Sequence, residues 1–321
     1  MSTVLKIGTR DSQLAVWQAA LVKDELAKAG VDSELVYIKS DGDIDLVTPL
    51  YAMNVQGVFT KALDAALLSK RIDVAVHSMK DVPTQLAQGI AQAAVLKRAS
   101  YTDIFVYKDE SVINTLHLYD NTGGFMSQAF ATIATSSVRR KAQWLHRYPN
   151  HSIENLRGNV NTRLRKVEES NWDGAIFAAA GLERINVRPK NSIDLQWMLP
   201  APAQGAIMVV CREEDADAMQ ACAVLNDAAT ALCAKIERDF LKTLMGGCST
   251  PISALAQIHD NTLTFKGSIF SLDGKQKAAI DKTIVIENNL TVENTGINCA
   301  NEILQNGGAA IIQTIRNAAN G

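Results

Sequence analysis

Residues 4–39, VLKIGTRDSQLAVWQAALVKDELAKAGVDSELVYIK, decide the fold of the first part of the chain. They open on the β-rich run VLKIG and continue as a helix that Asp11 or Ser12 caps and Gly30 stops. ELVYIK reads as a second strand, and a helix at Phe59–Lys70 and a strand at Ile72–Ser78 follow. This β-α-β-α-β order predicts parallel strands with helices on both faces of the sheet.

The same pattern restarts at ATIATSS, residues 131–137, and ends with WDGAIFAAAG, residues 172–181. A further strand is predicted at Ile207–Cys211, and two helical stretches follow over residues 213–245. From Ala254 onward, apolar and polar residues alternate around Asp-Asn and Asp-Gly turns, which is typical of antiparallel hairpins, and one or two helices close the chain. The residues thus predict two α/β lobes and a smaller α+β domain, with residues 108–130 as a loop or insertion.

The overall composition excludes several classes of function. The chain has 321 residues and a net charge of −2, which gives it no general attraction to nucleic acid or membranes. Its five cysteines form no C-x-x-C pair and its five histidines lack metal-ligand spacing, so neither disulfides nor a metal site are expected. The N-terminus lacks the pattern of a secretion signal, and no stretch has the length and apolarity of a membrane helix. We expect a cytoplasmic protein without a metal.

Arginines stand at four predicted junctions between a strand and the next helix. At one junction, Thr135, Ser136 and Ser137 precede a helix whose first turn carries Arg139 and Arg140. Cations at that end oppose the helix dipole, so helix stability does not explain them, whereas a bound anion does.

The segment LRGNVNTRLR repeats this design, with Arg157 before the helix, Asn159 as its cap, and Arg163 and Arg165 within it. The other two junctions carry Arg10, Ser12 and Arg184. All four lie at the carboxyl ends of strands, where open α/β sheets bind ligands. The pattern predicts a ligand with several carboxylates or phosphates, and the absence of a Walker loop argues against a nucleoside triphosphate. The alternative is that these arginines are ordinary surface charges that bind nothing.

The segment HSMKDVPT, residues 77–84, ends the third predicted strand with a candidate acid–base group. Pro83 forces Val82 to be extended, so that Lys80 and Asp81 stand at the same rim as the arginines. Near so many cations Asp81 should stay ionised, and it could transfer protons or stabilise a cationic intermediate. From this segment alone, an aspartate that caps a local turn is an equally good interpretation.

Cys248 lies in a glycine turn, LMGGCSTPI, whereas the other four cysteines lie in apolar or alanine-rich stretches. It could be a small buried hydrophobe. The turn has no His/Asp partner pattern, so it does not resemble the site of a protease nucleophile. A third use is the covalent attachment of a prosthetic group through sulfur. The residues alone do not choose among these uses.

Seven segments, in the same order along the chain, resemble the porphobilinogen deaminase (hydroxymethylbilane synthase) family. They are IGTRDSQLAVWQA, DVAVHSMKDVPT, ATSSVRRKAQW, LRGNVNTRLRK, FAAAGLERI, LPAPAQGA and ERDFLKTLMGGCSTPI. The resemblance implies an α/β fold with two lobes of mixed sheet, like those of periplasmic binding proteins, and a smaller α+β C-terminal domain. It implies a transferase of haem and other tetrapyrrole biosynthesis, which joins four porphobilinogen molecules head to tail into hydroxymethylbilane and releases ammonia. The implied cofactor is a dipyrromethane, assembled from substrate and held by a thioether.

The resemblance also assigns roles to individual residues. It implies that Cys248 carries the dipyrromethane and that Asp81 is catalytic, assisting the loss of ammonia and stabilising the electrophilic azafulvene. The residues implied to bind the cofactor are Ser78, Lys80, Asp81, Thr135, Ser137, Arg139, Arg140, Arg157 and Gln204. Those implied to bind the substrate are Arg10, Ser12, Arg157, Arg163 and Arg184. Each pyrrole carries two carboxylates, so the arginine pattern and the resemblance agree.

The resemblance implies a domain division as well. Residues 1–102 with 198–220 form lobe 1, which carries Asp81, and residues 103–197 form lobe 2. Residues 221–321 form the C-terminal domain with the attachment cysteine. We expect a monomer whose partner is the small molecule porphobilinogen, and neither nucleic acid nor a membrane. The alternative function is a non-catalytic polycarboxylate-binding or tetrapyrrole-binding protein on the same fold.

The chain departs from the family's pattern at several positions. Gln56 replaces a lysine expected to touch the cofactor, and Thr102 replaces a usual arginine. Asn161 and Ala203 stand where glycines are common. We therefore expect local differences in the backbone, but none at the two reactive residues.

Overall fold

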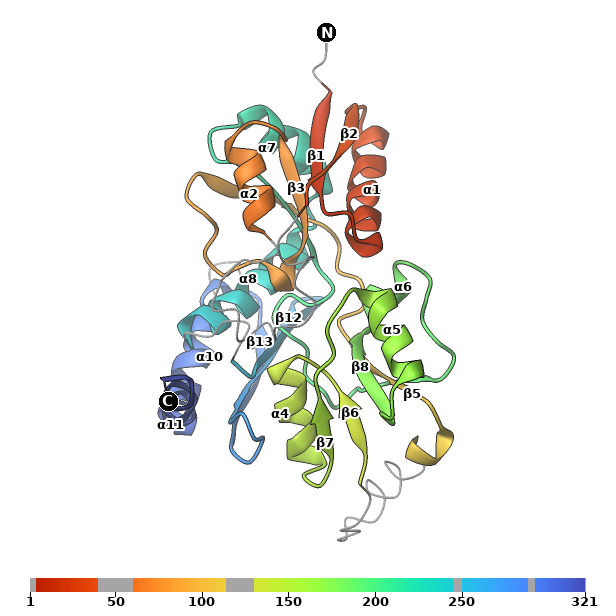
Figure 1. Cartoon of the computed structure of the whole chain (residues 1–321). Helices are drawn as coiled ribbons and strands as arrows, with labels where there is room; N and C mark the ends of the chain where they lie inside the picture. Colours follow the sequence, from red (N-terminus) through yellow and green to blue (C-terminus); the bar gives the residue numbers. More distant parts are fainter. Residues whose placement is uncertain (1–3, 40–59, 114–129, 245–249, 288–291, 321) are drawn as a thin grey trace.

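The computed structural model describes residues 4–39, 60–113, 130–244, 250–287 and 292–320. Figure 1 shows two α/β lobes, one above the other, and a third part in blue that lies beside the lower lobe and below the upper one. No helix among the described residues is long and apolar enough to cross a membrane.

Lobe 1 is built on a five-stranded mixed sheet in the order β2-β1-β3-β10-β4. Its strands are β1 (Leu5–Thr9), β2 (Ser33–Tyr37), β3 (Val74–Ser78), β4 (Ile90–Val95) and β10 (Ile207–Arg212). The first three run parallel, as predicted, while β10 runs antiparallel to both β3 and β4. The chain therefore returns to lobe 1 through β10 after it has built lobe 2.

Helices cover both faces of this sheet, because neighbouring strand residues point to opposite sides. Val74 and Val76 pack with α1 (Gln13–Lys28) and α7 (Ala216–Cys222). Ala75 and Met208 pack with α2 (Lys61–Leu68) and with Ala234 of α8 (Ala228–Thr243) on the other face. Helix α8 thus belongs to the core of lobe 1 as well as to that of the C-terminal part.

Lobe 2 repeats the plan with the order β7-β6-β8-β5-β9. Its strands are β5 (Asp103–Tyr107), β6 (Thr132–Ala134), β7 (Ser152–Glu154), β8 (Gly174–Ala178) and β9 (Ser192–Asp194). Strands β6, β7 and β8 are parallel, and β5 is antiparallel to its neighbours. Helix α4 (Val138–Arg147) covers one face through Trp144, and α5 (Val160–Glu169) and α6 (Ala179–Glu183) cover the other.

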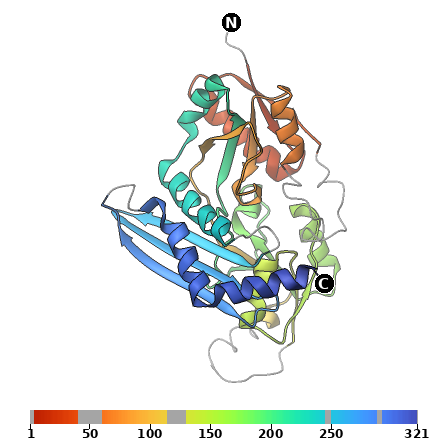
Figure 2. The ribbon, with the colours of Figure 1, turned by 90° about the vertical axis from the view of Figure 1, so that its left-hand side faces the viewer.

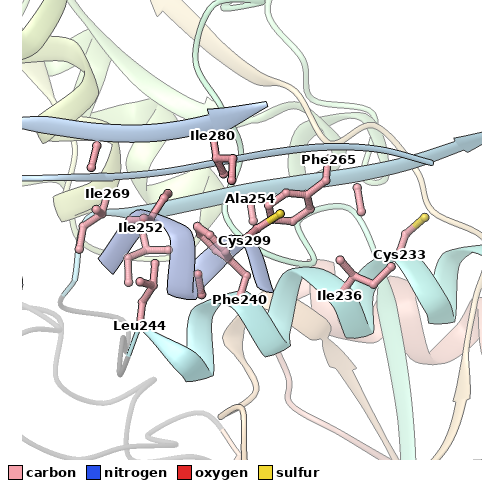
Figure 3. Close-up of a cluster of buried hydrophobic side chains, with 14 of the residues drawn as sticks. Cys233, Ile236, Phe240, Leu244, Ile252, Ala254, Phe265, Ile269, Ile280 and Cys299 are labelled. Atoms are coloured by element: carbon pink, nitrogen blue, oxygen red, sulfur yellow. The ribbon is translucent and has the colours of Figure 1, made fainter. Parts of the chain in front are cut away.

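The C-terminal part is a three-stranded antiparallel sheet of β11 (Ile252–His259), β12 (Thr262–Phe270) and β13 (Lys277–Val285). Its two hairpins turn at the predicted dipeptides, with positive φ angles of 51° at Asp260 and 75° at Gly274. Helices α8, α10 (Thr295–Ile303) and α11 (Ala309–Asn320) cover one face (Figure 2). Figure 3 shows Ile236 and Phe240 of α8 directed toward Phe265 of the sheet.

The observed elements confirm the predicted fold class, an α/β protein with two mixed five-stranded sheets and an antiparallel third domain. The helix predicted at Phe59–Lys70 is observed as α2, which spans Lys61–Leu68. Of the predicted insertion at residues 108–130, residues 110–113 form helical turns. Residues 114–129 lie outside the described part of the chain.

Candidate active site

The junction before α4 has the predicted form. Ser137 is the N-cap, and its Oγ accepts a hydrogen bond from the Arg140 backbone N–H at 3.4 Å. The Thr135 Oγ1 accepts one from the Ser137 N–H at 3.2 Å. These two bonds fix the start of the helix and with it the side chains of Arg139 and Arg140, both of which are buried.

The partner of both arginines is Asp103, the first residue of β5, whose side chain is fully buried. Its Oδ2 accepts from Arg139 Nη1 at 2.7 Å, and its Oδ1 accepts from Arg140 Nε at 3.1 Å and Nη2 at 2.7 Å. Burial alone would raise the pKa of Asp103, but the charges and hydrogen bonds of the two arginines hold it well below its usual range.

The pairing with Asp103 corrects one step of the sequence argument. That step required a bound anion to explain cations in the first turn of α4, whereas a carboxylate of the protein itself faces them. The sequence held a signal, because an aspartate that opens the apolar strand DIFVY must find a cationic partner when it is buried. That Arg139 and Arg140 also contact a cofactor remains a prediction.

Gln204 connects this buried cluster to lobe 1. Its Nε2 donates to Asp103 Oδ1 at 2.9 Å and to the Tyr101 carbonyl at 2.7 Å. Its Oε1 accepts from Lys80 Nζ and from Arg139 Nη2, both at 3.4 Å. Burial lowers the pKa of Lys80 to about 8, with Asp81 opposing the shift and Arg140 adding to it. Predicted residues of both lobes therefore meet at Gln204.

Asp81 ends the short helical turn η3 (Met79–Asp81), and its side chain is exposed. Val82 is extended, with φ −86° and ψ 129°, as the following proline requires. Asp81 is close enough to Arg163 of α5 to oppose the lowering of that arginine's pKa. Asp81 of lobe 1 therefore lies within electrostatic range of Arg163 of lobe 2.

The junction before α5 also has the predicted cap, since Asn159 Oδ1 accepts from the Thr162 N–H at 2.9 Å. Arg163 Nε donates to the Gly158 carbonyl at 2.7 Å. Burial and the charges of Arg140 and Arg157 lower the pKa of Arg163 to about 10. Three cations therefore lie within one another's electrostatic range, and an anion placed among them would be stabilised.

The remaining predicted residues lie at the edges of this site. Ser78, at the end of β3, accepts a hydrogen bond from Gln18 Nε2 at 2.9 Å. Burial and, to a smaller extent, the charge of the nearby Arg10 lower the pKa of His77 to about 4. Ser12 precedes α1, but its side chain makes no capping bond.

Arg184 follows α6 and reaches back to lobe 1. Its Nη2 donates to the Gly205 carbonyl at 2.7 Å, and its guanidinium lies 5.7 Å from the centre of the Trp17 ring. Burial lowers its pKa to about 10. The substrate-binding role predicted for Arg184 is untested by these contacts, which tie lobe 2 to lobe 1.

Cys248 and Gln56 lie outside the described residues. The other four cysteines, Cys211, Cys222, Cys233 and Cys299, are free, buried thiols. Burial raises the pKa of Cys222 to about 12 and that of Cys299 to about 11. Such thiols are poor nucleophiles at neutral pH, which sets them apart from a cysteine in a glycine turn.

The departures from the family pattern have local consequences. Ala203 is buried and adopts a φ of 61°, in the left-handed region that favours glycine. Its N–H donates to Glu237 Oε2 of α8 at 2.6 Å, which helps to hold this conformation. Asn161 Nδ2 donates to Gln13 Oε1 at 2.8 Å and so connects α5 with α1 of the other lobe.

Sequence reasoning also missed an ion pair behind the site. Arg98 binds Glu237 through two hydrogen bonds, of 2.6 and 3.1 Å, and its Nε donates to the Gln204 carbonyl at 2.8 Å. Glu237 is fully buried. No periodicity pairs residues this far apart in the sequence, so only the fold reveals them.

The donor set suits a small polycarboxylate. Guanidinium groups bind carboxylates through paired hydrogen bonds, and several of them converge here with one lysine. Among the residues that the structure describes, no group of His, Cys, Asp or Glu side chains could hold a metal ion. The residues present therefore fit a cofactor made of pyrroles that each bear two carboxylates.

Comparisons with known proteins identify the family. Residues 5–220 match the family model of the porphobilinogen deaminase dipyrromethane cofactor binding domain, and residues 231–305 match that of the porphobilinogen deaminase C-terminal domain. A porphobilinogen deaminase of Chloroherpeton thalassium is 37% identical over 98% of this chain and 99% of its own length. One of Trichlorobacter lovleyi is 38% identical over 97% and 96%. Among solved structures, the VFT2 domain of Bordetella pertussis BvgS, a double mutant, is 13% identical with a TM-score of 0.42, over 69% of this chain and 86% of that one. The chain belongs to the porphobilinogen deaminase (hydroxymethylbilane synthase) family, transferases of tetrapyrrole biosynthesis that carry a dipyrromethane cofactor.

Proposed function

We propose that Asp81 is the catalytic carboxylate of the porphobilinogen deaminase reaction and that the arginines around it bind the carboxylates of cofactor and substrate. One observation carries the proposal. An exposed aspartate on lobe 1 lies within electrostatic range of a buried or half-buried arginine group on lobe 2, where burial and, to a smaller extent, mutual repulsion lower the pKa of Arg163. Such a group favours binding of anions, and each pyrrole brings two.

The family resemblance divides the residues into two sets. One set would hold the dipyrromethane, and it consists of Ser78, Lys80, Asp81, Thr135, Ser137, Arg139, Arg140, Arg157 and Gln204. The other set would hold incoming porphobilinogen, and it consists of Arg10, Ser12, Arg157, Arg163 and Arg184. Arg157 belongs to both sets and would bind at their border.

Asp81 would act on the charge that develops during condensation. When the carbon–nitrogen bond of porphobilinogen breaks, ammonia leaves and positive charge spreads over the pyrrole. A carboxylate that accepts a hydrogen bond from the pyrrole N–H stabilises this charge. It can also carry the proton that the attacking pyrrole carbon must lose. The dipyrromethane, when bound, supplies the terminal pyrrole on which the four-unit chain grows.

We further propose that Cys248 forms the thioether to the dipyrromethane. The turn Gly246-Gly247 before it and the burial of the four other thiols support this choice. We propose the domain division 1–102 with 198–220, 103–197 and 221–321, and a monomeric enzyme of the cytoplasm that binds no nucleic acid. Four free thiols fit a reducing compartment.

Replacing Asp81 by asparagine tests the catalytic role. Asp81→Asn keeps the shape of the side chain but removes its charge and its ability to exchange a proton. We expect turnover of porphobilinogen to fall by about 10²-fold to 10⁴-fold while thermal unfolding is unchanged. Asp217→Asn, an exposed carboxylate at the start of α7 on the same lobe, serves as the control. Near-normal turnover of a folded Asp81→Asn protein removes Asp81 from the mechanism.

A further inference from the structure

Arg238 of α8 contacts the turn that carries Asp81. Its Nη1 donates to the carbonyl oxygens of Met79 at 3.3 Å and Val82 at 2.9 Å, and its Nη2 donates to that of Pro83 at 2.6 Å. Three main-chain carbonyls on either side of Asp81 therefore converge on one guanidinium.

The turn depends on such a partner because of its own backbone. The Met79 carbonyl also accepts a hydrogen bond from the Val82 N–H at 3.2 Å, whereas Pro83 brings no N–H that could serve a carbonyl of the turn. Three carbonyl dipoles that point at one place repel each other unless a cation lies between them. A planar guanidinium has five donors in a fork and can serve three acceptors, whereas the ammonium of a lysine is a compact point charge.

The turn and α8 also share an apolar cluster, in which Met79 and Val82 pack with Ala234. A cavity of about 430 Å³ lies between them, lined on the turn side by Met79, Thr84 and Leu86. Arg238 lines the same cavity and spans it. The hydrogen bonds of Arg238 therefore add a polar connection to the apolar contact between the turn and the helix.

Helix α8 also holds the other half of the site. Glu237, the residue before Arg238, accepts hydrogen bonds from the N–H groups of Ala203 at 2.6 Å and Ala256 at 2.8 Å. Ala203 precedes Gln204, and Ala256 lies in β11. The same helix ends at Thr243, shortly before Cys248 in the sequence. One helix thus connects the Asp81 turn, the Gln204 turn and the segment that leads to the attachment cysteine.

We propose that Arg238 is a positioning residue, which fixes Asp81 in space relative to Gln204 and the C-terminal end of α8. The inference rests on the proposed roles of Asp81 and Cys248. Arg238 acts through the backbone and not through the carboxylate-binding arginines. Its loss should therefore slow the chemical step and change substrate binding little.

The test uses the cofactor-loaded enzyme, with loading checked by intact mass. We expect Arg238→Met to lower kcat by about 10-fold to 100-fold, because a displacement of about 1 Å at a catalytic group has effects of this size. KM should change less than about threefold. Backbone amides of residues 79–90 should exchange with deuterium at least about tenfold faster, because the turn opens more often. Arg238→Lys should recover part of kcat.

Lys235→Met is the matched control, because Lys235 lies one turn earlier on α8, lines the same cavity and pairs with Asp239 at 2.8 Å. In this control, kcat and the deuterium-exchange rates of residues 79–90 should stay within about twofold of those of the original protein. A folded, loaded Arg238→Met enzyme with normal kcat and normal exchange overturns the proposal, and so does one whose only defect is a lower melting temperature. If Arg238→Met does not fold, unchanged kcat and exchange in Arg238→Lys overturn it. Failure of the proposed function can be told apart from failure of this inference. If the proposed function is wrong, Asp81→Asn remains active, whereas the deuterium exchange of Arg238→Met still shows whether Arg238 holds the turn.

Discussion

The two helices of lobe 2 that begin with arginines start in the same way, yet their arginines lie in different electrostatic surroundings. Ser137 caps α4 and Asn159 caps α5, each through a hydrogen bond to a backbone N–H three residues on. In α4, Arg139 and Arg140 share the buried carboxylate of Asp103.

In α5, the charge on Arg163 is opposed by other cations. Burial and the charges of Arg140 and Arg157 lower its pKa, and the carboxylate that opposes this effect is Asp81 of the other lobe. A single aspartate on β5 thus gives the α4 junction a carboxylate partner within its own lobe, whereas Asp81, the carboxylate that acts on Arg163 at the α5 junction, comes from the other lobe. We therefore expect loss of Asp103 to act mainly on stability and loss of Arg163 to act mainly on ligand binding.

Among the variants that test this contrast, removal of the Asp103 carboxylate should have the largest effect, and it should act on the free energy of unfolding. Asp103→Asn leaves two buried guanidinium groups without their anion, which costs about 3–5 kcal/mol of unfolding free energy. Urea denaturation measures the loss. Asp109→Asn, at an exposed carboxylate near the end of β5, should change stability by less than about 0.5 kcal/mol. A loss below about 1 kcal/mol for Asp103→Asn would show that the α4 junction is not held together by this carboxylate.

Removal of Arg163 should have the next largest effect, and on binding instead of stability. Arg163→Met removes one hydrogen bond but also relieves repulsion, so unfolding free energy should stay within about 1 kcal/mol of the original. Loss of a charged hydrogen bond to a substrate carboxylate should lower kcat/KM by about 10-fold to 100-fold. Arg165→Met on the same helix is the control, because Arg165 is exposed and pairs with Glu169 at the surface. Equal kcat/KM values for the two variants would contradict the contrast between the junctions.

The titration of Lys80 should give the smallest effect. Burial and the nearby arginines lower its pKa to about 8, so its charged fraction falls as pH rises through 8. The experiment uses Cys248→Ser protein, which should not carry the cofactor. Acetylation of Lys80 should reach half its maximal rate near pH 8, because only the neutral amine reacts. Lys28, whose pKa Glu25 raises, should need a higher pH. Peptide mass spectrometry follows both lysines, and a Lys80 midpoint near 10.5 would contradict the lowering of its pKa by burial and the nearby arginines.

The local features of this fold could be predicted from the sequence. Short β-rich runs predicted the strands of the lobes, and Ser137 and Asn159 marked two helix starts. Alternating apolar and polar residues with Asp-Asn and Asp-Gly turns marked the C-terminal hairpins. The arginines stood out because they opposed the helix dipole at one end of the sheet. These signals are all carried by residues within a few positions of each other.

Contacts between distant segments could not be predicted. Asp103 meets Arg139 and Arg140 only after β5 has paired with β8, and Arg238 meets the Asp81 turn only after α8 has packed on lobe 1. In each case two segments more than 30 positions apart are joined by side chains that no local pattern links. The arginines were found, but the pairing of two of them with Asp103 needed the fold.

Covalent attachment of the cofactor is the central claim, and intact mass spectrometry tests it most directly. The purified protein and Cys248→Ser are measured before and after incubation with porphobilinogen, and the modified peptide is located by proteolysis. We predict that the original protein carries, or gains on incubation, the mass of two linked pyrrole units on the peptide that contains Cys248, and that Cys248→Ser does not retain it. An unmodified mass after incubation, or the same added mass in Cys248→Ser, would contradict the account.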